Sequence, residues 1–216
     1  MVDAVFFDVD GVLIDSVGVK GDAFADAFAG YPDRRDAIIA FHQANGGLPR
    51  GSKIRRILEE VFERDATTAE VDRITALFAA SVLDRVLGAP EIEGASATLT
   101  ALRRDIPMHA VSATPEAELI HILAERNWTR HFTSIHGVPP EKAETVRILI
   151  QKHGYEPARC FLIGDSSHDH AAAVANGVPF IHVSTNESDR ISDAAVVVPD
   201  LVSLPHLLLG APKMDL

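Results

Sequence analysis

Four short segments of the chain carry residue types that bind cations and phosphate groups. Asp8-Val9-Asp10-Gly11 stands near the start, Ser112 near the middle, then Lys142, and finally Gly164-Asp165 with Asp169. Four carboxylates brought close together raise one another's pKa unless a cation lies among them. Carboxylates without a cluster of Cys or His ligands favour a hard ion such as Mg²⁺, which shares its shell with waters and phosphate. The set therefore predicts a Mg²⁺ site beside a lysine.

A regular alternation of strands and helices would bring these segments together. Short β-prone runs cover residues 2–8, 107–112, 132–136, 160–164, 179–183 and 195–198. Helical patterns cover residues 94–104, 115–126, 141–153 and 169–176. Such alternation predicts an α/β fold with a parallel sheet covered on both faces. Ligands of open α/β sheets bind beyond the carboxyl ends of the strands, so we expect Asp8, Ser112 and Asp165 to meet at that edge.

The stretch between the first two strands breaks this alternation. Apolar residues recur there at helical spacing, and Thr67 with Glu70 has the pattern of a capping box. A Gly46-Gly47-Leu48-Pro49 turn divides the stretch. We predict a helical cap domain of residues 16–91, inserted into an α/β core domain of residues 1–15 and 92–216.

The order of the polar segments closely resembles the haloacid dehalogenase-like hydrolase superfamily, in particular its phosphatase branch. That branch carries Asp-x-Asp-Gly, then Ser or Thr, then Lys, then Gly-Asp with a following Asp, which here are the segments from Asp8 to Asp169. The resemblance spans the chain, and the insertion matches the small helical cap of phosphoglycolate phosphatase and β-phosphoglucomutase relatives. It implies a Rossmann-like three-layer sheet with a cap, and Mg²⁺-dependent hydrolysis of a small phosphomonoester.

The resemblance also implies a role for each candidate residue. Asp8 would attack phosphorus and form an aspartyl phosphate, and Asp10 would serve as acid and then as base. The metal residues it implies are Asp8, Asp10 through its main-chain carbonyl, Asp165, and Asp169 in support. The phosphate-binding residues it implies are Ser112, Ala113, Lys142 and Gly11.

The cap supplies a further pair of candidates. Arg50 and Lys53 flank the start of a cap helix, directly after the glycine-containing turn. In the family this turn reaches down over the active site, so we expect these two cations to contact an anionic or hydroxyl-rich part of the substrate.

Three other functions share parts of this pattern. A sugar phosphomutase of the β-phosphoglucomutase kind uses the same Asp pair, but those enzymes have a lysine soon after the second-motif serine, and Thr114-Pro115-Glu116 offers none nearby. A dehalogenase does not use the second Asp as acid and base. A phosphorylation-switched binding module, such as a receiver domain, is shorter and has no cap.

The composition limits the classes of binding partner that the protein can have. The formal charge of -11 repels nucleic acid and anionic membranes, and no apolar run approaches membrane-spanning length. A single cysteine, Cys160, and a start without signal-peptide features predict a cytoplasmic protein. We expect a small phosphorylated metabolite as partner, and a monomer or homodimer.

Overall fold

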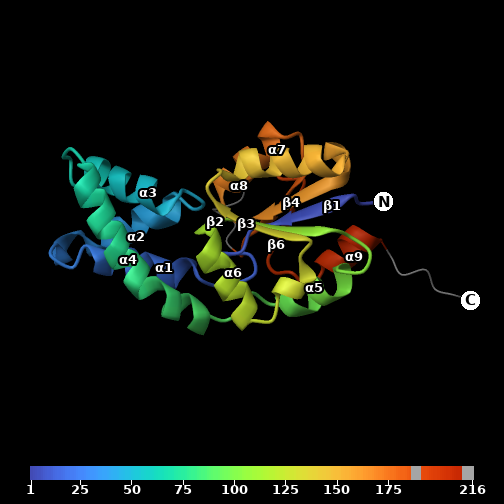
Figure 1. The fold of residues 1–216 in the computed structure, drawn as a ribbon, viewed down its shortest axis with the longest axis horizontal. Coiled ribbons are helices and arrows are strands. Elements are labelled where there is room, and N and C mark those ends of the chain that lie inside the picture. The colour runs from blue at the N-terminus through green and yellow to red at the C-terminus, as the bar shows by residue number, and fades with distance from the viewer. Residues whose placement is uncertain (186–190, 211–216) are drawn as a thin grey trace, which may run out of the picture.

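The computed structural model describes residues 1–185 and 191–210. Within these residues, six parallel strands form one sheet in the order β3-β2-β1-β4-β5-β6 (Figure 1). The strands are β1 (Ala4–Phe7), β2 (Met108–Pro115), β3 (Ser134–Val138), β4 (Cys160–Gly164), β5 (Phe180–Val183) and β6 (Val196–Val198). The predicted α/β class is confirmed, and β1 lies in the middle of the sheet.

Helices cover both faces of this sheet. Helices α7 (Lys142–His153) and α8 (Ser167–Ala175) lie on one face. Helices α5 (Ala95–Leu102), α6 (Glu116–Glu125) and α9 (Leu204–Leu209) lie on the other (Figure 1). The arrangement is the predicted three-layer fold.

Strand β1 contributes to two apolar clusters, one on each face of the sheet. All four of its residues are buried. Successive side chains of a strand point to opposite faces, so Val5 and Phe7 pack into one apolar cluster while Ala4 and Phe6 pack into the other. An apolar run without polar alternation is typical of a strand buried on both sides.

The segment between β1 and α5 is helical, as predicted. It contains α1 (Val17–Ala27), η1 (Pro32–Arg34), α2 (Arg35–Ala44), α3 (Arg50–Arg56), η2 (Ile57–Val61) and α4 (Thr68–Gly88). These helices lie beyond one end of the sheet (Figure 1). The division into two domains stays a prediction.

The start of α4 differs from its expected capping box. The Thr67 hydroxyl accepts a hydrogen bond from the Glu70 N–H, as an N-cap residue does. The Glu70 carboxylate, however, pairs with Arg64 at 2.7 Å. The full charge of Arg64 makes it a stronger partner than a backbone N–H.

The chain leaves and re-enters the sheet at one place. Ile14 and Glu91 form an antiparallel bridge. The Asp15 N–H donates to the Pro90 carbonyl at 2.9 Å, and the Ile92 N–H donates to the Leu13 carbonyl at 3.0 Å. The segment that leaves the sheet and the segment that returns to it are therefore hydrogen-bonded to each other.

Strand β2 extends further than predicted. We expected it to end at Ser112, but it continues to Pro115, and its register against β3 shifts between Val111 and Pro115. Such an irregularity bends a strand and re-aims its side chains. Ser112, Ala113 and Thr114 lie within this stretch of shifted register. No helix in the described part of the chain has the length and apolar character to cross a membrane.

Candidate active site

Asp8 lies directly after β1, at the carboxyl edge of the central strand. Its N–H donates to the Ile163 carbonyl at 2.9 Å, which continues the sheet pairing. The side chain is 4% exposed, and the Lys142 ammonium lies 3.0 Å from its Oδ1. Burial raises the pKa of Asp8 to about 7, and Asp169 and Asp10 act in the same direction, although Lys142 opposes them. A further cation nearby would favour the ionised form of Asp8 at neutral pH.

Lys142 is the first residue of α7, as predicted, and it joins two carboxylates. It pairs with Asp8 and also with Oδ1 of Asp169. Burial alone would lower the pKa of Lys142, but the charges of Asp169 and Asp8 raise it above its ordinary value. Lys142 is thus charged, and its ammonium lies beside the proposed nucleophile.

Asp169 is fully buried, and both of its oxygens have partners. Oδ2 accepts hydrogen bonds from the Ser166 N–H at 3.1 Å and the Ser166 hydroxyl at 2.5 Å, in a capping box at the start of α8. Oδ1 accepts from Lys142. Such contacts suit a supporting role that orients Lys142.

Asp8, Asp165 and Asp169 form an acidic cluster whose ligand atoms all lie within 4.8 Å of one another. Within the described part of the chain, the Asp165 carboxylate accepts no hydrogen bond. Burial and the charges of Asp169 and Asp8 raise its pKa well above the usual range. An all-oxygen cluster with more negative than positive charge fits Mg²⁺. The cluster could therefore hold the predicted metal ion.

Gly11 allows Asp165 to approach the end of β1. Its φ is +76°, in the region that side chains rarely adopt. A Cβ at this position would overlap the Asp165 carboxylate. The glycine is therefore required for backbone geometry and for space.

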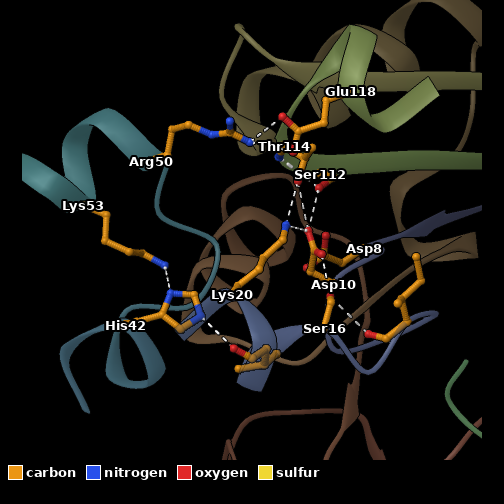
Figure 2. A network of polar contacts seen from close by, with 12 residues as sticks. Asp8, Asp10, Ser16, Lys20, His42, Arg50, Lys53, Ser112, Thr114 and Glu118 are labelled. Atoms are coloured by element: carbon orange, nitrogen blue, oxygen red, sulfur yellow. Dashed lines mark hydrogen bonds and ion pairs between the residues drawn. The ribbon is translucent and has the colours of Figure 1, made fainter. Parts of the chain in front are cut away.

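Asp10 lies in a network that we did not predict from the sequence (Figure 2). Its Oδ2 lies 2.6 Å from the Lys20 ammonium and accepts from the Thr114 hydroxyl at 3.0 Å. Its Oδ1 accepts from the Ser16 hydroxyl at 2.6 Å. Burial alone would raise the pKa of Asp10, but Lys20, together with the hydrogen bonds from Ser16 and Thr114, lowers it to about 2.

The stretch of β2 with the register shift lies beside Asp10. The Ser112 hydroxyl lies 3.5 Å from Oδ2 of Asp10 and accepts from the Thr114 N–H at 3.1 Å. Thr114 also accepts a hydrogen bond from Lys20 at 3.0 Å. Ala113, between them, lines the same cavity. Ser112 and Ala113 thus lie at the cavity, although within β2 and not after its end, whereas Thr114 was missed.

The two cap cations have different surroundings (Figure 2). Arg50 donates through one terminal nitrogen to both oxygens of Glu118 on α6, at 2.8 and 2.9 Å. Lys53 is 3% exposed, and its ammonium lies 3.0 Å from Nδ1 of His42 on α2. His42 is a further residue that we did not predict.

These residues surround one cavity of about 60 Å³ between the cap and the sheet. Polar residues from both parts line it, including Asp8, Asp10, Lys20, Lys53 and Asp165. The remaining wall is largely apolar, with Val17, Phe24, Leu48 and Phe78. The cavity can thus hold a small molecule with polar and apolar parts.

The glycine-containing turn of the cap packs on the loop before α8. A Cβ at Gly46 would lie 2.9 Å from Cβ of Ser166, and one at Gly47 would lie 2.8 Å from Cβ of His168. Both distances are too short for real side chains. The small residues therefore let the cap close over the edge of the sheet.

Comparisons with known proteins agree with this geometry. The model of the haloacid dehalogenase-like hydrolases matches residues 2–177. Phosphoglycolate phosphatase 1 of Pseudomonas aeruginosa is 30% identical over 181 residues, which are 81% of this chain and 66% of that protein. The 6-phosphogluconate phosphatase of Escherichia coli is 31% identical over 134 residues, which are 61% of this chain and 57% of that protein. The chain thus spans two thirds or less of the length of both relatives.

Solved structures share the fold. The structure of a putative phosphoglycolate phosphatase from Lactobacillus delbrueckii subsp. bulgaricus matches with a TM-score of 0.79 at 19% identity, over 98% of this chain and all of that one. The likeness extends over both the sheet and the helical insertion. The chain therefore belongs to the haloacid dehalogenase-like hydrolase family, in the phosphatase branch that carries a small helical cap.

Proposed function

We propose that this phosphatase hydrolyses a small phosphomonoester through an aspartyl phosphate on Asp8, with Mg²⁺ in the acidic cluster. The observation that carries the proposal is the position of Asp8 at the end of β1, beside Lys142, with Asp10 facing the same cavity. In the first step an Asp8 oxygen bonds to phosphorus as the bond from phosphorus to the alkyl oxygen breaks. In the second step water bonds to phosphorus and the bond to Asp8 breaks.

Asp10 would move the protons of both steps. The departing alkyl oxygen takes a proton from the Asp10 carboxyl, and the attacking water later returns one to it. Because Lys20 lowers the pKa of Asp10 to about 2, the arrangement seen here is ready for the second step. For the first step Asp10 must gain a proton, so we infer that the alkyl oxygen of the substrate displaces Lys20 from Oδ2.

Lys142 and the second motif would hold the phosphoryl group. The Lys142 ammonium, the Ser112 hydroxyl and the backbone of Ala113 lie around the carboxyl ends of β1 and β2. Donors fixed before the reaction stabilise the charge that develops on the phosphoryl oxygens. Asp8, Asp165 and Asp169 are the residues that would hold Mg²⁺, which supplies charge compensation for the phosphoryl group when bound.

Trapping the covalent intermediate tests this function. The wild-type enzyme is mixed with Mg²⁺ and a panel of phosphorylated metabolites, and phosphate release is measured alongside acid-quench mass spectrometry of the protein. We expect turnover and a transient phosphate adduct on Asp8, and neither in Asp8→Asn. Stable phosphorylation without turnover would indicate a switch module, and transfer between two positions of a sugar would indicate a mutase.

A further inference from the structure

Thr114 is a buried polar residue of the site to which the proposed mechanism gives no part. It is 3% exposed and lines the cavity. A hydroxyl group has one hydrogen to donate and two lone pairs that accept. The Lys20 ammonium can only donate and an ionised Asp10 can only accept, so the Thr114 hydroxyl accepts from Lys20 and donates to Oδ2 of Asp10, each at 3.0 Å (Figure 2). The single hydroxyl proton of Thr114 is therefore bound to the carboxylate.

The oxygen that Thr114 contacts is the one that would exchange a proton with the substrate. Lys20 contacts the same Oδ2 of Asp10 at 2.6 Å, and in the proposed first step the alkyl oxygen displaces this ammonium. The Ser112 hydroxyl lies 3.5 Å from Oδ2, at the long limit of a hydrogen bond, and its proposed partner is the phosphoryl group. Among the described residues, Thr114 is thus the donor that stays on Oδ2 when substrate is bound.

Two hydroxyl groups hold the two oxygens of Asp10. Ser16, just before α1, donates to Oδ1 at 2.6 Å, and Thr114, in β2, donates to Oδ2. A carboxylate bound through both oxygens cannot rotate about its Cβ–Cγ bond without breaking one of these contacts. Lys20 lies on a helix of the cap, whereas Thr114 belongs to the sheet. The contact between Thr114 and Asp10 therefore needs no particular position of the cap.

The backbone around Thr114 fixes the direction of its side chain. Pro115 restricts the residue before it to extended conformations, and branching at Cβ limits the rotation of a threonine side chain. The Thr114 N–H donates to the Ser112 hydroxyl at 3.1 Å. On the neighbouring strand β3, Gly137 leaves space for this backbone, because a Cβ there would overlap the Thr114 carbonyl. The hydroxyl is thus held in place before substrate binds.

We propose that Thr114 is a positioning residue for Asp10, and that its hydroxyl keeps Oδ2 directed toward the substrate in both steps of the reaction. This inference rests on the proposed function. In the first step Oδ2 gives its proton to the alkyl oxygen, and in the second step Oδ2 takes a proton from water. Thr114 releases no proton and forms no bond to phosphorus in either step. Proton transfer requires hydrogen-bond reach, so a carboxylate that turns away transfers its proton slowly.

Thr114→Val tests the inference, because valine keeps the branched shape and lacks the hydroxyl. We expect kcat for glycerol 3-phosphate to fall about tenfold and KM to stay within about twofold, as for a lost hydrogen bond to a charged group. The loss in kcat/KM should be smaller for p-nitrophenyl phosphate, whose aryloxide can leave without a proton. Thr114→Ser keeps the hydroxyl and should retain kcat to within about threefold. Thr98→Val is the matched control: it removes a buried hydroxyl that donates to the Leu201 carbonyl at 2.7 Å, and it should change neither substrate.

A double-mutant cycle shows whether Thr114 acts through Asp10. Asp10→Asn removes the proposed acid and base, so Thr114→Val in that background should lower kcat for glycerol 3-phosphate by less than about twofold. The kcat for p-nitrophenyl phosphate includes the second step, in which Asp10 takes the proton from water. It should give the same cycle for that step.

The cycle separates the inference from the proposed function. Equal losses from Thr114→Val in both backgrounds would overturn the inference and assign the threonine to the structure of β2. Unchanged kcat in Thr114→Val for both substrates would overturn it too, because Asp10 would then be held without the hydroxyl. If the wild-type enzyme with Mg²⁺ hydrolyses neither substrate nor any metabolite of the panel, the proposed function itself fails.

Discussion

The ammonium of Lys20 lies 2.6 Å from Oδ2 of Asp10, so a helix of the cap contacts the carboxylate that follows β1. Lys20 is buried on α1, and Asp10 belongs to the motif of the sheet edge. Closure of the cap and the charge of the proposed acid and base are therefore coupled through one contact.

Removal of this contact should slow the second step of the reaction, in which Asp10 takes a proton from water. In Lys20→Met, burial still acts on Asp10 without the ammonium, so the pKa of Asp10 should rise from about 2 toward or above its ordinary value. We expect kcat to fall about tenfold or more, as for a lost charge-assisted hydrogen bond, and the acidic limb of the pH profile to move to higher pH. Steady-state kinetics from pH 4 to 9 measure both. An unchanged limb would mean that Lys20 does not set the protonation of Asp10.

Asp10→Asn should separate substrates by their leaving groups. An amide neither gives nor takes the proton, so turnover of alkyl phosphates should fall about 100-fold or more. The aryloxide of an aryl phosphate can leave without taking a proton, so the rate of the first step should fall less for these substrates. The measurement is kcat/KM for glycerol 3-phosphate and p-nitrophenyl phosphate in both enzymes. Equal losses would contradict the acid role.

Mg²⁺ should raise the stability of the folded protein. Three carboxylates within 4.8 Å of one another repel, and a bound cation removes that repulsion. At 100 times its dissociation constant a metal adds about 2.7 kcal/mol to the free energy of unfolding, seen as an increase in Tm. Asp165→Asn should abolish the increase, and Asp72→Asn, at an exposed position on α4, should keep it.

A chelator should abolish activity, and Ca²⁺ should inhibit because its shell is larger and looser.

His109 should make the fold sensitive to acid. It is buried in β2, 2.7 Å from the Ser134 hydroxyl and 3.1 Å from the Tyr155 hydroxyl. Burial, with His153 and His136, lowers its pKa to about 4, below its ordinary value of about 6.5. The unfolded chain therefore binds this proton first as the pH falls, and stability is lost between about pH 6.5 and pH 4.

The size of this effect can be measured by urea unfolding. At pH 5 the loss attributable to His109 should be about 2 kcal/mol relative to pH 8. His109→Gln should flatten that part of the curve, whereas His121→Gln, at an exposed site on α6, should leave it unchanged. The same slope in all three proteins would assign the acid sensitivity to other groups.

Arg50 stays a predicted substrate contact, and its ion pair offers a control. Glu118 binds one terminal nitrogen of the guanidinium, which has other N–H donors. We expect Arg50→Gln to raise KM for the best natural substrate about tenfold and to leave p-nitrophenyl phosphate unchanged. Glu118→Gln should have little effect on either. If both variants behave alike, Arg50 acts by holding the cap closed.

Most of the residues predicted from the sequence lie close to the end of a strand or the start of a helix, in a fixed order along the chain. Asp8, Asp165 and Lys142 could be found because parallel strands deliver their ends to one edge. Asp10 and Ser112 could be found because they stand within two to four residues of such an end. The alternation of strands and helices was enough to predict that these residues lie at one edge of the sheet.

The network around Asp10 could not be found in this way. Lys20 is ten residues from Asp10, and nothing in that spacing brings them together until α1 folds over the sheet edge. One signal existed, because Ala23, Phe24 and Ala27 follow Lys20 at helical spacing and place it on the buried face. Thr114 was missed for another reason, since we expected the strand to end at Ser112, whereas it continues to Pro115.

The pairing of Ile14 with Glu91 also bears on how such enzymes diverge. The chain leaves the sheet for the helices and returns to it at the same point, so the whole helical segment is attached to the sheet at one place. A different segment could be grafted there without any change in the order of the strands. Such a graft would replace the part of the cavity wall that the helical segment supplies, which includes Phe24, Leu48 and Phe78. Lys20 contacts Asp10 from within the helical segment, so a segment that replaces it must keep this residue.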